Sequence, residues 1–220
     1  MLLKHGLAGL THKAAAGGSD SLVWSDDFDG YSSGTFLTAD ADWTAVDSLN
    51  SRVITSVAGG PIYLNSASSG SQAVRNETTT GNDQAIEALI NLAPVGGEQI
   101  LRMFVRMSAS TGYADFYSLD IKYRTTGSVE WGEAVISKNV SSTLTAITDG
   151  GAQNITAPAV GQYVRFEVIG TTLTAYVNGV SVATATDSAH SAGQAAIEFE
   201  NISTSTTGFG VDEIIIYEIV

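Results

Sequence analysis

The sequence predicts an all-β protein whose strands form two antiparallel sheets packed against each other. Residues 162–187 hold three runs in which apolar and polar residues alternate, the period of two that buries one face of a strand. Asn178 and Gly179 separate the second run from the third, and this pair favours a two-residue hairpin turn with two positive φ angles. No window has the period of a long amphipathic helix. Three antiparallel strands need another sheet over their apolar face, so we expect a sandwich.

The strands before this unit are assigned from the same period and from the turn residues between them. In residues 84–92, the alternating set that we expect to be buried is Ile86, Ala88, Ile90 and Leu92. In chain order, strands are predicted at 21–28, 52–57, 61–64, 72–77, 84–92, 99–107, 115–124, 129–137 and 144–148. Residues 35–46 are predicted to form a loop and a strand that carries Trp43, and residues 155–161 lead into the three-strand unit.

Two segments are predicted to be covered on both faces. Residues 99–107 are strongly apolar and are broken by Arg102 and Arg106, so we place this strand in the centre of a sheet. Residues 194–200 and 210–220 supply the last two strands. Ile214, Ile215 and Ile216 follow one another, which predicts that both faces of the final strand are buried.

Residues 1–20 are predicted to form an extended N-terminal arm, and residues 21–220 the sandwich domain. The arm has few core-forming residues and ends in Ala and Gly with the composition of a flexible hinge. Its apolar run is too short and too often interrupted for a signal peptide or a membrane span. A disordered tail is one interpretation. The other is a segment that docks on a partner subunit through Leu2, Leu3, Lys4, Leu7, Leu10 and Lys13.

Composition limits the partners of the protein. The chain has 10 Lys and Arg against 23 Asp and Glu, a formal net charge of −13. Residues 1–19 carry two lysines and no acid, so the arm and the domain have opposite signs. A body of this charge repels nucleic-acid phosphates and anionic membranes, and we expect neither as a partner. Cysteine is absent, which excludes a disulfide framework, a thiolate metal site and a cysteine nucleophile.

Three segments resemble known domains. They are the run TLTAYVNG within residues 162–187, the opening WSDDFDG with Trp43 beyond it, and the closing FGVDEIIIY. Together they resemble the concanavalin A-like and laminin G-like jelly-roll superfamily over residues 21–220. The resemblance implies a two-sheet antiparallel jelly-roll sandwich, which is a statement about fold rather than function.

The resemblance also implies a calcium site, because domains of this superfamily often bind the ion where the first and last strands meet. Asp26 or Asp27 with Asp212 would supply the carboxylate oxygens that calcium takes as ligands. The alternative is that these aspartates accept hydrogen bonds from backbone amides in turns. On either interpretation no cofactor is required.

Aromatic residues gather around one hairpin and predict a sugar-binding platform. Such rings pack on the apolar face of a sugar while nearby carboxylates bind its hydroxyl groups. The alternative is that these rings, like Trp24 and Trp43, belong to the core. The predicted platform consists of Tyr113, Tyr117, Tyr123 and Trp131.

Glycoside hydrolysis is the enzymatic alternative, because glucanases of the resembled superfamily use two carboxylates on one strand. Glu198 and Glu200 point to one face of a strand, with a separation of about 7 Å from the strand rise. Retaining enzymes need about 5 Å, and the residues around this pair depart from the glucanase order. We therefore expect no enzyme, and we expect both glutamates to be solvated above a core face made by Ile197 and Phe199.

Three functional hypotheses follow. The first is a non-enzymatic structural protein of a bacteriophage or virus particle, in which the arm docks a lectin-like jelly roll on capsid or tail subunits. It implies a homo-oligomer on the virion surface, with cell-surface glycans as further partners. The second is a carbohydrate-binding module or lectin that acts by itself outside cells, with calcium fixing its loops. The third is a glycoside hydrolase.

Overall fold

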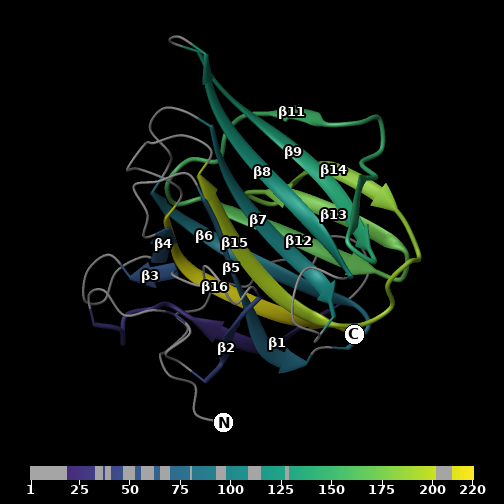
Figure 1. Ribbon diagram of the computed structural model, residues 1–220, viewed down its shortest axis with the longest axis horizontal. Helices are drawn as coiled ribbons and strands as arrows, with labels where there is room; N and C mark the ends of the chain where they lie inside the picture. Colours follow the sequence, from purple (N-terminus) through teal and green to yellow (C-terminus); the bar gives the residue numbers. More distant parts are fainter. Residues whose placement is uncertain are drawn as a thin grey trace.

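The computed structural model describes residues 19–32, 37, 41–46, 53–55, 62–64, 70–79, 81–92, 98–108, 115–126, 129–201 and 210–220. Within these ranges every element is a strand, and the strands form two antiparallel sheets that lie one behind the other in Figure 1. The predicted all-β sandwich is confirmed. The same ranges contain no helix with the length and apolarity to cross a membrane. The predicted docking residues, from Leu2 to Lys13, lie outside them, as does Tyr113, whereas Asp20, predicted as the last residue of the arm, begins the first strand.

Sheet A has eight strands in the order β14-β13-β12-β6-β16-β4-β3, with β1 also paired to β16. The final strand therefore lies inside the sheet rather than at its edge. The bounds are β1 (Asp20–Asp26), β3 (Val53–Thr55), β4 (Ile62–Leu64), β6 (Gln84–Leu92), β12 (Tyr163–Ile169), β13 (Thr172–Val177), β14 (Val180–Thr186) and β16 (Gly210–Ile219).

Sheet B also has eight strands, in the order β10-β9-β8-β7-β15-β5-β2, with β11 paired to β9. Its strand β7 lies between β8 and β15, which confirms the predicted central position of residues 99–107. The bounds are β2 (Trp43–Ala45), β5 (Gly70–Thr79), β7 (Glu98–Met107), β8 (Phe116–Thr126), β9 (Val129–Val140), β10 (Thr143–Ala146), β11 (Gln153–Ile155) and β15 (Gln194–Asn201).

The predicted three-strand unit is confirmed as β12, β13 and β14. Val164 pairs with Val177 across the first hairpin, and Val177 pairs with Val180 across the second. Asn178 and Gly179 between them have φ angles of 49° and 78°, both in the left-handed region that a type I′ turn requires. The Asn-Gly pair thus sets the register of the edge of sheet A.

A single large core lies between the sheets. Sheet A contributes Val164, Phe166 and Val168 from β12, and sheet B contributes residues such as Leu101 and Met103 from β7. These side chains are fully buried, as strand alternation requires of residues on one face. Burial of such apolar surface is the main force that holds the sheets together, at about 25 cal/mol per Å².

Two tryptophans belong to this core, as predicted. Trp24 on β1 and Trp43 on β2 meet edge to face, with ring centroids 5.0 Å apart, so they join the start of sheet A to the edge of sheet B. Ile214, Ile215 and Ile216 on β16 are all buried, which confirms that the last strand is covered on both faces.

The outer face of sheet A is buried as well, and this corrects one expectation. In β6 the set Ile86, Ala88 and Ile90 is buried as predicted, but the alternate residues Ala85 and Glu87 are buried too. Glu87 is buried because it belongs to a charged network on that outer face. A polar residue in an alternating strand was expected to contact water, and here it contacts an arginine instead.

Arg165 on β12 is the centre of that network. Its guanidinium donates two hydrogen bonds of 2.9 Å to Asp20 of β1 and one of 2.9 Å to Glu167, and it lies 3.5 Å from Glu87. Tyr176 donates a hydrogen bond to Glu167. Burial lowers the pKa of Arg165, but the hydrogen bonds and charge of Asp20 outweigh burial and raise it above its ordinary value. The arginine therefore stays charged.

Replacing Arg165 by Leu is expected to destabilise the domain by about 3–5 kcal/mol, because it leaves buried carboxylates without a counter-charge. Urea unfolding monitored by tryptophan fluorescence measures the loss. The control is Asp29→Asn, a change of one charge at an exposed residue, which should shift the free energy of unfolding by about 0.5 kcal/mol or less. Equal effects of the two substitutions would contradict the role given to Arg165.

Candidate functional site

The face of sheet B that points away from the core carries a row of charged side chains. Alternation fixes this arrangement, because the residues one step along each strand, such as Ile121 on β8 and Ile136 on β9, lie in the core. Register then brings the charged residues of four strands side by side. We call this the polar face, and its residues are Arg102, Asp120, Lys122, Trp131, Glu133, Glu198 and Glu200.

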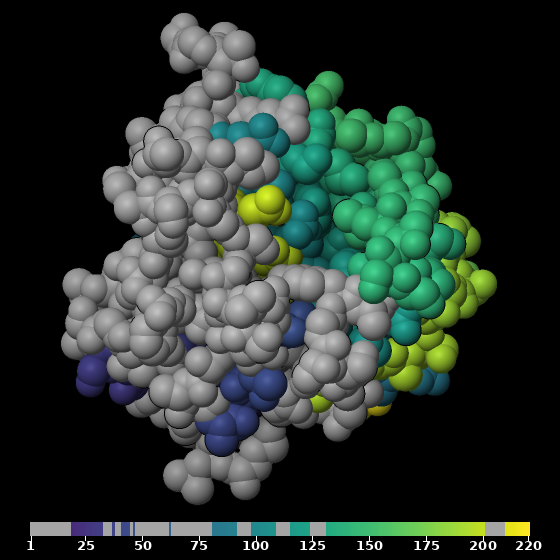
Figure 2. Space-filling view, in the orientation of Figure 1, coloured from purple at the N-terminus to yellow at the C-terminus, as the bar shows by residue number. Residues whose placement is uncertain are grey.

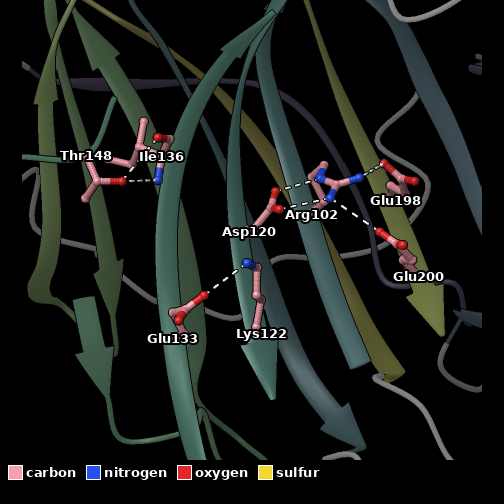
Figure 3. A network of polar contacts seen from close by, with 8 residues as sticks. All are labelled: Arg102, Asp120, Lys122, Glu133, Ile136, Thr148, Glu198 and Glu200. Atoms are coloured by element: carbon pink, nitrogen blue, oxygen red, sulfur yellow. Dashed lines mark hydrogen bonds and ion pairs between the residues drawn. The ribbon is translucent and has the colours of Figure 1, made fainter. Parts of the chain in front are cut away.

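Arg102 on β7 is the hub of the polar face (Figure 3). Its Nε and Nη2 atoms donate to the two oxygens of Asp120 on β8 at 2.6 and 2.9 Å. Nη1 donates to Glu198 at 2.8 Å and Nη2 to Glu200 at 3.3 Å, both on β15. One guanidinium thus holds three carboxylates from the strands on either side of β7.

Burial differs sharply among these carboxylates. The side chain of Glu198 is 1% exposed, whereas that of Glu200 is 28% exposed. Burial raises the pKa of Glu198 above its ordinary value, and the charge of Arg102 opposes that rise. Burial lowers the pKa of Arg102, but Asp120 and Glu198 more than compensate, so the guanidinium stays charged.

The next two rows of paired residues add an ion pair and then an indole. Lys122 on β8 contacts Glu133 on β9 at 3.0 Å. Trp131 lies two residues before Glu133 on the same strand, so it shares that face, and its side chain is half-buried. Strand spacing and rise put the Cα atoms of Trp131 and Glu200 about 16 Å apart. The polar face is therefore an extended surface and not a single point.

The polar face lies in a hollow of the molecular surface. Figure 2 shows the yellow and blue atoms of the central strands at a deeper level than the green atoms of β9 to β11 beside them. At the other end of the same outer face the side chains are apolar and closed to solvent, and they are Val46, Phe104, Met107, Phe116 and Ala196. Within the charged part, Glu200, Lys122 and Glu133 are partly exposed, whereas Asp120 and Glu198 are buried.

The structure separates the residues predicted for the sugar platform. Tyr117 and Tyr123 are buried in the core, at 0% and 3% exposure, so the prediction of a platform is corrected for these two rings. They alternate in phase with Leu119 and Ile121, a signal that was present in the sequence. Trp131 alone among the described members lies on the polar face.

The two predicted carboxylates on β15 do share one face, and Ile197 and Phe199 between and beside them are in the core as expected. The expectation that both glutamates are solvated is wrong for Glu198, because Arg102 draws its carboxylate into the sheet. Sequence reasoning placed Asp120 and Glu133 among the carboxylates near the predicted platform but missed Arg102 and Lys122 as members of the site. Alternation could place each on an outer face, but only the pairing of β7 with β15 brings them to the glutamates.

Two of the aspartates predicted to bind calcium, Asp26 and Asp27, act as turn residues. Asp26 accepts hydrogen bonds from the Phe28 amide at 2.8 Å and from the Tyr31 hydroxyl at 2.9 Å, and Asp27 accepts one from the Asp29 amide at 3.2 Å. Asp212 is half-buried on β16. In the described residues no three acidic or histidine side chains are grouped so as to hold a metal. Calcium binding by Asp26 or Asp27 with Asp212 stays a prediction.

Comparisons with known proteins agree on the fold. No protein-family model matches the sequence, and no curated protein sequence matches it. Among solved structures, β-agarase A from Zobellia galactanivorans is 14% identical, with 96% of this chain and 97% of that chain covered and a TM-score of 0.63. The carbohydrate recognition domain of Emp47p is 11% identical (94% and 100% covered, TM-score 0.58). The carbohydrate-binding module CBM66 from Bacillus subtilis is 15% identical (81% and 93% covered, TM-score 0.50).

These likenesses, together with the two antiparallel sheets, confirm the predicted jelly-roll sandwich. At such identities they establish the fold and leave function to the site itself. None of them concerns a virion, a capsid or a bacteriophage.

Glu198→Gln is expected to change how stability depends on pH. Since burial raises the pKa of Glu198, folding favours the protonated carboxyl. The resulting stabilisation of the folded state is complete below the unfolded-state pKa of about 4.3, and it is lost as pH rises through the higher folded-state pKa. The stability of wild type relative to the variant should therefore fall as pH rises above about 4. Urea unfolding at several pH values measures it.

Glu200→Gln is the matched control for that experiment, because it removes one charge from the same strand and the same arginine while the affected side chain is partly exposed. A stability difference between wild type and Glu198→Gln that stays constant over the whole range would mean that burial does not govern the ionisation of Glu198.

Proposed function

We propose that this domain binds oligosaccharides through the polar face and does not hydrolyse them. The observation that carries the proposal is the combination on one recessed sheet face of a half-buried indole, Trp131, with charged groups in adjoining register rows. Lys122 and Glu133 lie in the row next to Trp131, and Arg102 lies in the row beyond. Sugars need both kinds of group, an aromatic ring for their apolar face and charged or amide groups for their hydroxyls.

The charged groups are held in place before a ligand arrives. Asp120 is fixed by two hydrogen bonds from Arg102, and Lys122 by Glu133. Side chains that are already ordered lose little conformational entropy on binding, which favours affinity for weakly binding ligands such as sugars. The rigid β-sheet beneath them adds to this preorganisation.

The extent of the polar face favours a chain of sugars over a monosaccharide. Trp131 and Glu200 mark its two ends, and a separation of about 16 Å spans several sugar rings. A monosaccharide would contact one register row, whereas an oligosaccharide lying across β9, β8, β7 and β15 would contact all of them.

Proteins of similar fold support a carbohydrate ligand. A carbohydrate recognition domain and a carbohydrate-binding module are among them, and β-agarase A forms a complex with oligoagarose. The hypothesis of a carbohydrate-binding module or lectin is therefore preferred to the hypothesis of a virion structural protein. A virion structural role anchored by the arm, with capsid or tail partners, remains a hypothesis of the sequence that no described contact favours.

Glycoside hydrolysis is the second candidate, and one observation favours it. Glu198 and Glu200 project from one strand to the same guanidinium, and burial raises the pKa of Glu198, as is common for a carboxyl that donates a proton. Against it, the hydrogen bond from Arg102 occupies the carboxylate that a substrate would need to reach.

Trp131→Ala is expected to weaken oligosaccharide binding by about tenfold or more, which is about 1.4 kcal/mol, because the apolar surface for the sugar is lost. Isothermal titration calorimetry measures the change. Trp131→Phe keeps an aromatic ring and should restore part of the affinity. Tyr123→Phe, at a buried ring, is the control that leaves binding unchanged. Full affinity in Trp131→Ala would remove the polar face as the binding site.

Reducing-end assays separate binding from hydrolysis. We expect no release of sugar from any oligosaccharide that the wild type binds, and the same result for Glu200→Gln. Turnover by wild type that Glu200→Gln abolishes would instead establish the glycoside hydrolase, since a retaining mechanism loses its chemistry when either carboxylate becomes an amide.

A further inference from the structure

The polar face carries more acid than base. Its described side chains include the acids Asp120, Glu133, Glu198 and Glu200, against Arg102 and Lys122 as bases. Register places Arg124 of β8 between Trp131 of β9 and Glu98 of β7, so the row of Trp131 holds one residue of each charge sign. The whole chain has a net charge of −13, which extends the same sign beyond the site.

Arg102 and Lys122, the two cations of the polar face whose side chains the structure describes, are both engaged by carboxylates. Lys122 is engaged by Glu133 at 3.0 Å. Arg102 is engaged by Asp120, Glu198 and Glu200, and it is the counter-charge for Glu198, whose side chain is 1% exposed. Moving the guanidinium to a sulfate or carboxylate of a ligand would leave that glutamate buried and uncompensated, a costly arrangement. A negatively charged sugar would instead meet the fixed carboxylates, which carry the same sign of charge.

Glu200 is the acid least committed to the network. Its side chain is the most exposed of the carboxylates on the face, at 28%, and its hydrogen bond from Arg102 is the longest of the four, at 3.3 Å. An ammonium group at the β15 end of the site could pair with Glu200 without breaking the bidentate contact between Arg102 and Asp120. Such a pair is partly desolvated, so it adds affinity beyond that of an exposed ion pair.

We infer that the polar face selects its ligand by charge: it takes glycans that are neutral or that carry amino groups, it rejects glycans with sulfate or carboxylate groups, and Glu200 is the residue that meets an amino group. This inference rests on the proposed carbohydrate binding and names the ligand class of the same site. Selection by charge differs from recognition of sugar shape, because one and the same sugar chain should be bound or rejected according to the charge of its substituents.

The test is calorimetric titration of the full chain at low salt with matched oligosaccharides of glucose, glucosamine and glucuronic acid, equal in linkage and length, and with the corresponding galactose set. The amino sugar is expected to bind at least as tightly as the neutral one. The carboxylated sugar is expected to bind at least tenfold more weakly, and the gap should narrow at high salt as the charges are screened.

Two substitutions test whether Glu200 causes the preference for amino sugars. Glu200→Gln should reduce the preference for the amino sugar over the neutral one by about threefold to tenfold. Asp29→Asn makes the same change of charge at an exposed residue outside the polar face and should leave that preference unaltered. A preference that survives Glu200→Gln would overturn the role of Glu200.

The outcomes also separate this inference from the function on which it rests. Equal or tighter binding of the carboxylated sugars overturns charge selection while carbohydrate binding stands. Failure of every sugar in both sets to bind overturns carbohydrate binding at this face, and charge selection with it.

Discussion

Compensation of buried acidic charge is the constraint that organises both outer faces of this sandwich. The chain has more than twice as many acids as bases, so one arginine must serve several carboxylates. Arg165 does so on sheet A, for Asp20, Glu87 and Glu167. Arg102 does so on sheet B, for Asp120, Glu198 and Glu200. Arg102 reaches the strands on both sides of β7, whereas Arg165 on β12 binds Glu167 of its own strand and extends to one side only, toward β6 and β1.

The two networks have different consequences because they differ in exposure. Around Arg165 all three carboxylates are nearly closed to solvent, and the tyrosines Tyr176 and Tyr217 use their hydroxyls to complete the hydrogen bonding. That arrangement stabilises the fold and leaves no group for a ligand. Around Arg102 the outermost carboxylate, Glu200, and the neighbouring Lys122 remain partly exposed, and Trp131 lies on the same outer face. An arginine that binds three carboxylates thus stabilises the fold on sheet A, and on sheet B it forms a surface suited to ligand recognition.

Local patterns predicted the strands well, because alternation and Asn-Gly turns are properties of neighbouring residues. β6 begins and ends at the predicted residues, and the turn at Asn178 has the expected backbone angles. The site was predicted less well, because it depends on which strands pair. Arg102 and Glu198 are 96 residues apart in sequence, and no local pattern relates them. The burial of Tyr117 and Tyr123 was readable from their alternation with Leu119 and Ile121, whereas the ion pairing of Glu198 was not.

The topology has a consequence for how the chain is made. Strands β15 and β16 are the last two in this sequence, yet β15 lies between β7 and β5, and β16 between β6 and β4. A nascent chain that ends before residue 194 therefore has each sheet in two unjoined halves, with open edges in the middle of the future domain. Such edges invite pairing with other chains. During synthesis the protein depends on late, long-range strand insertion, so its folding is expected to be slow and sensitive to chaperones that shield unpaired strands.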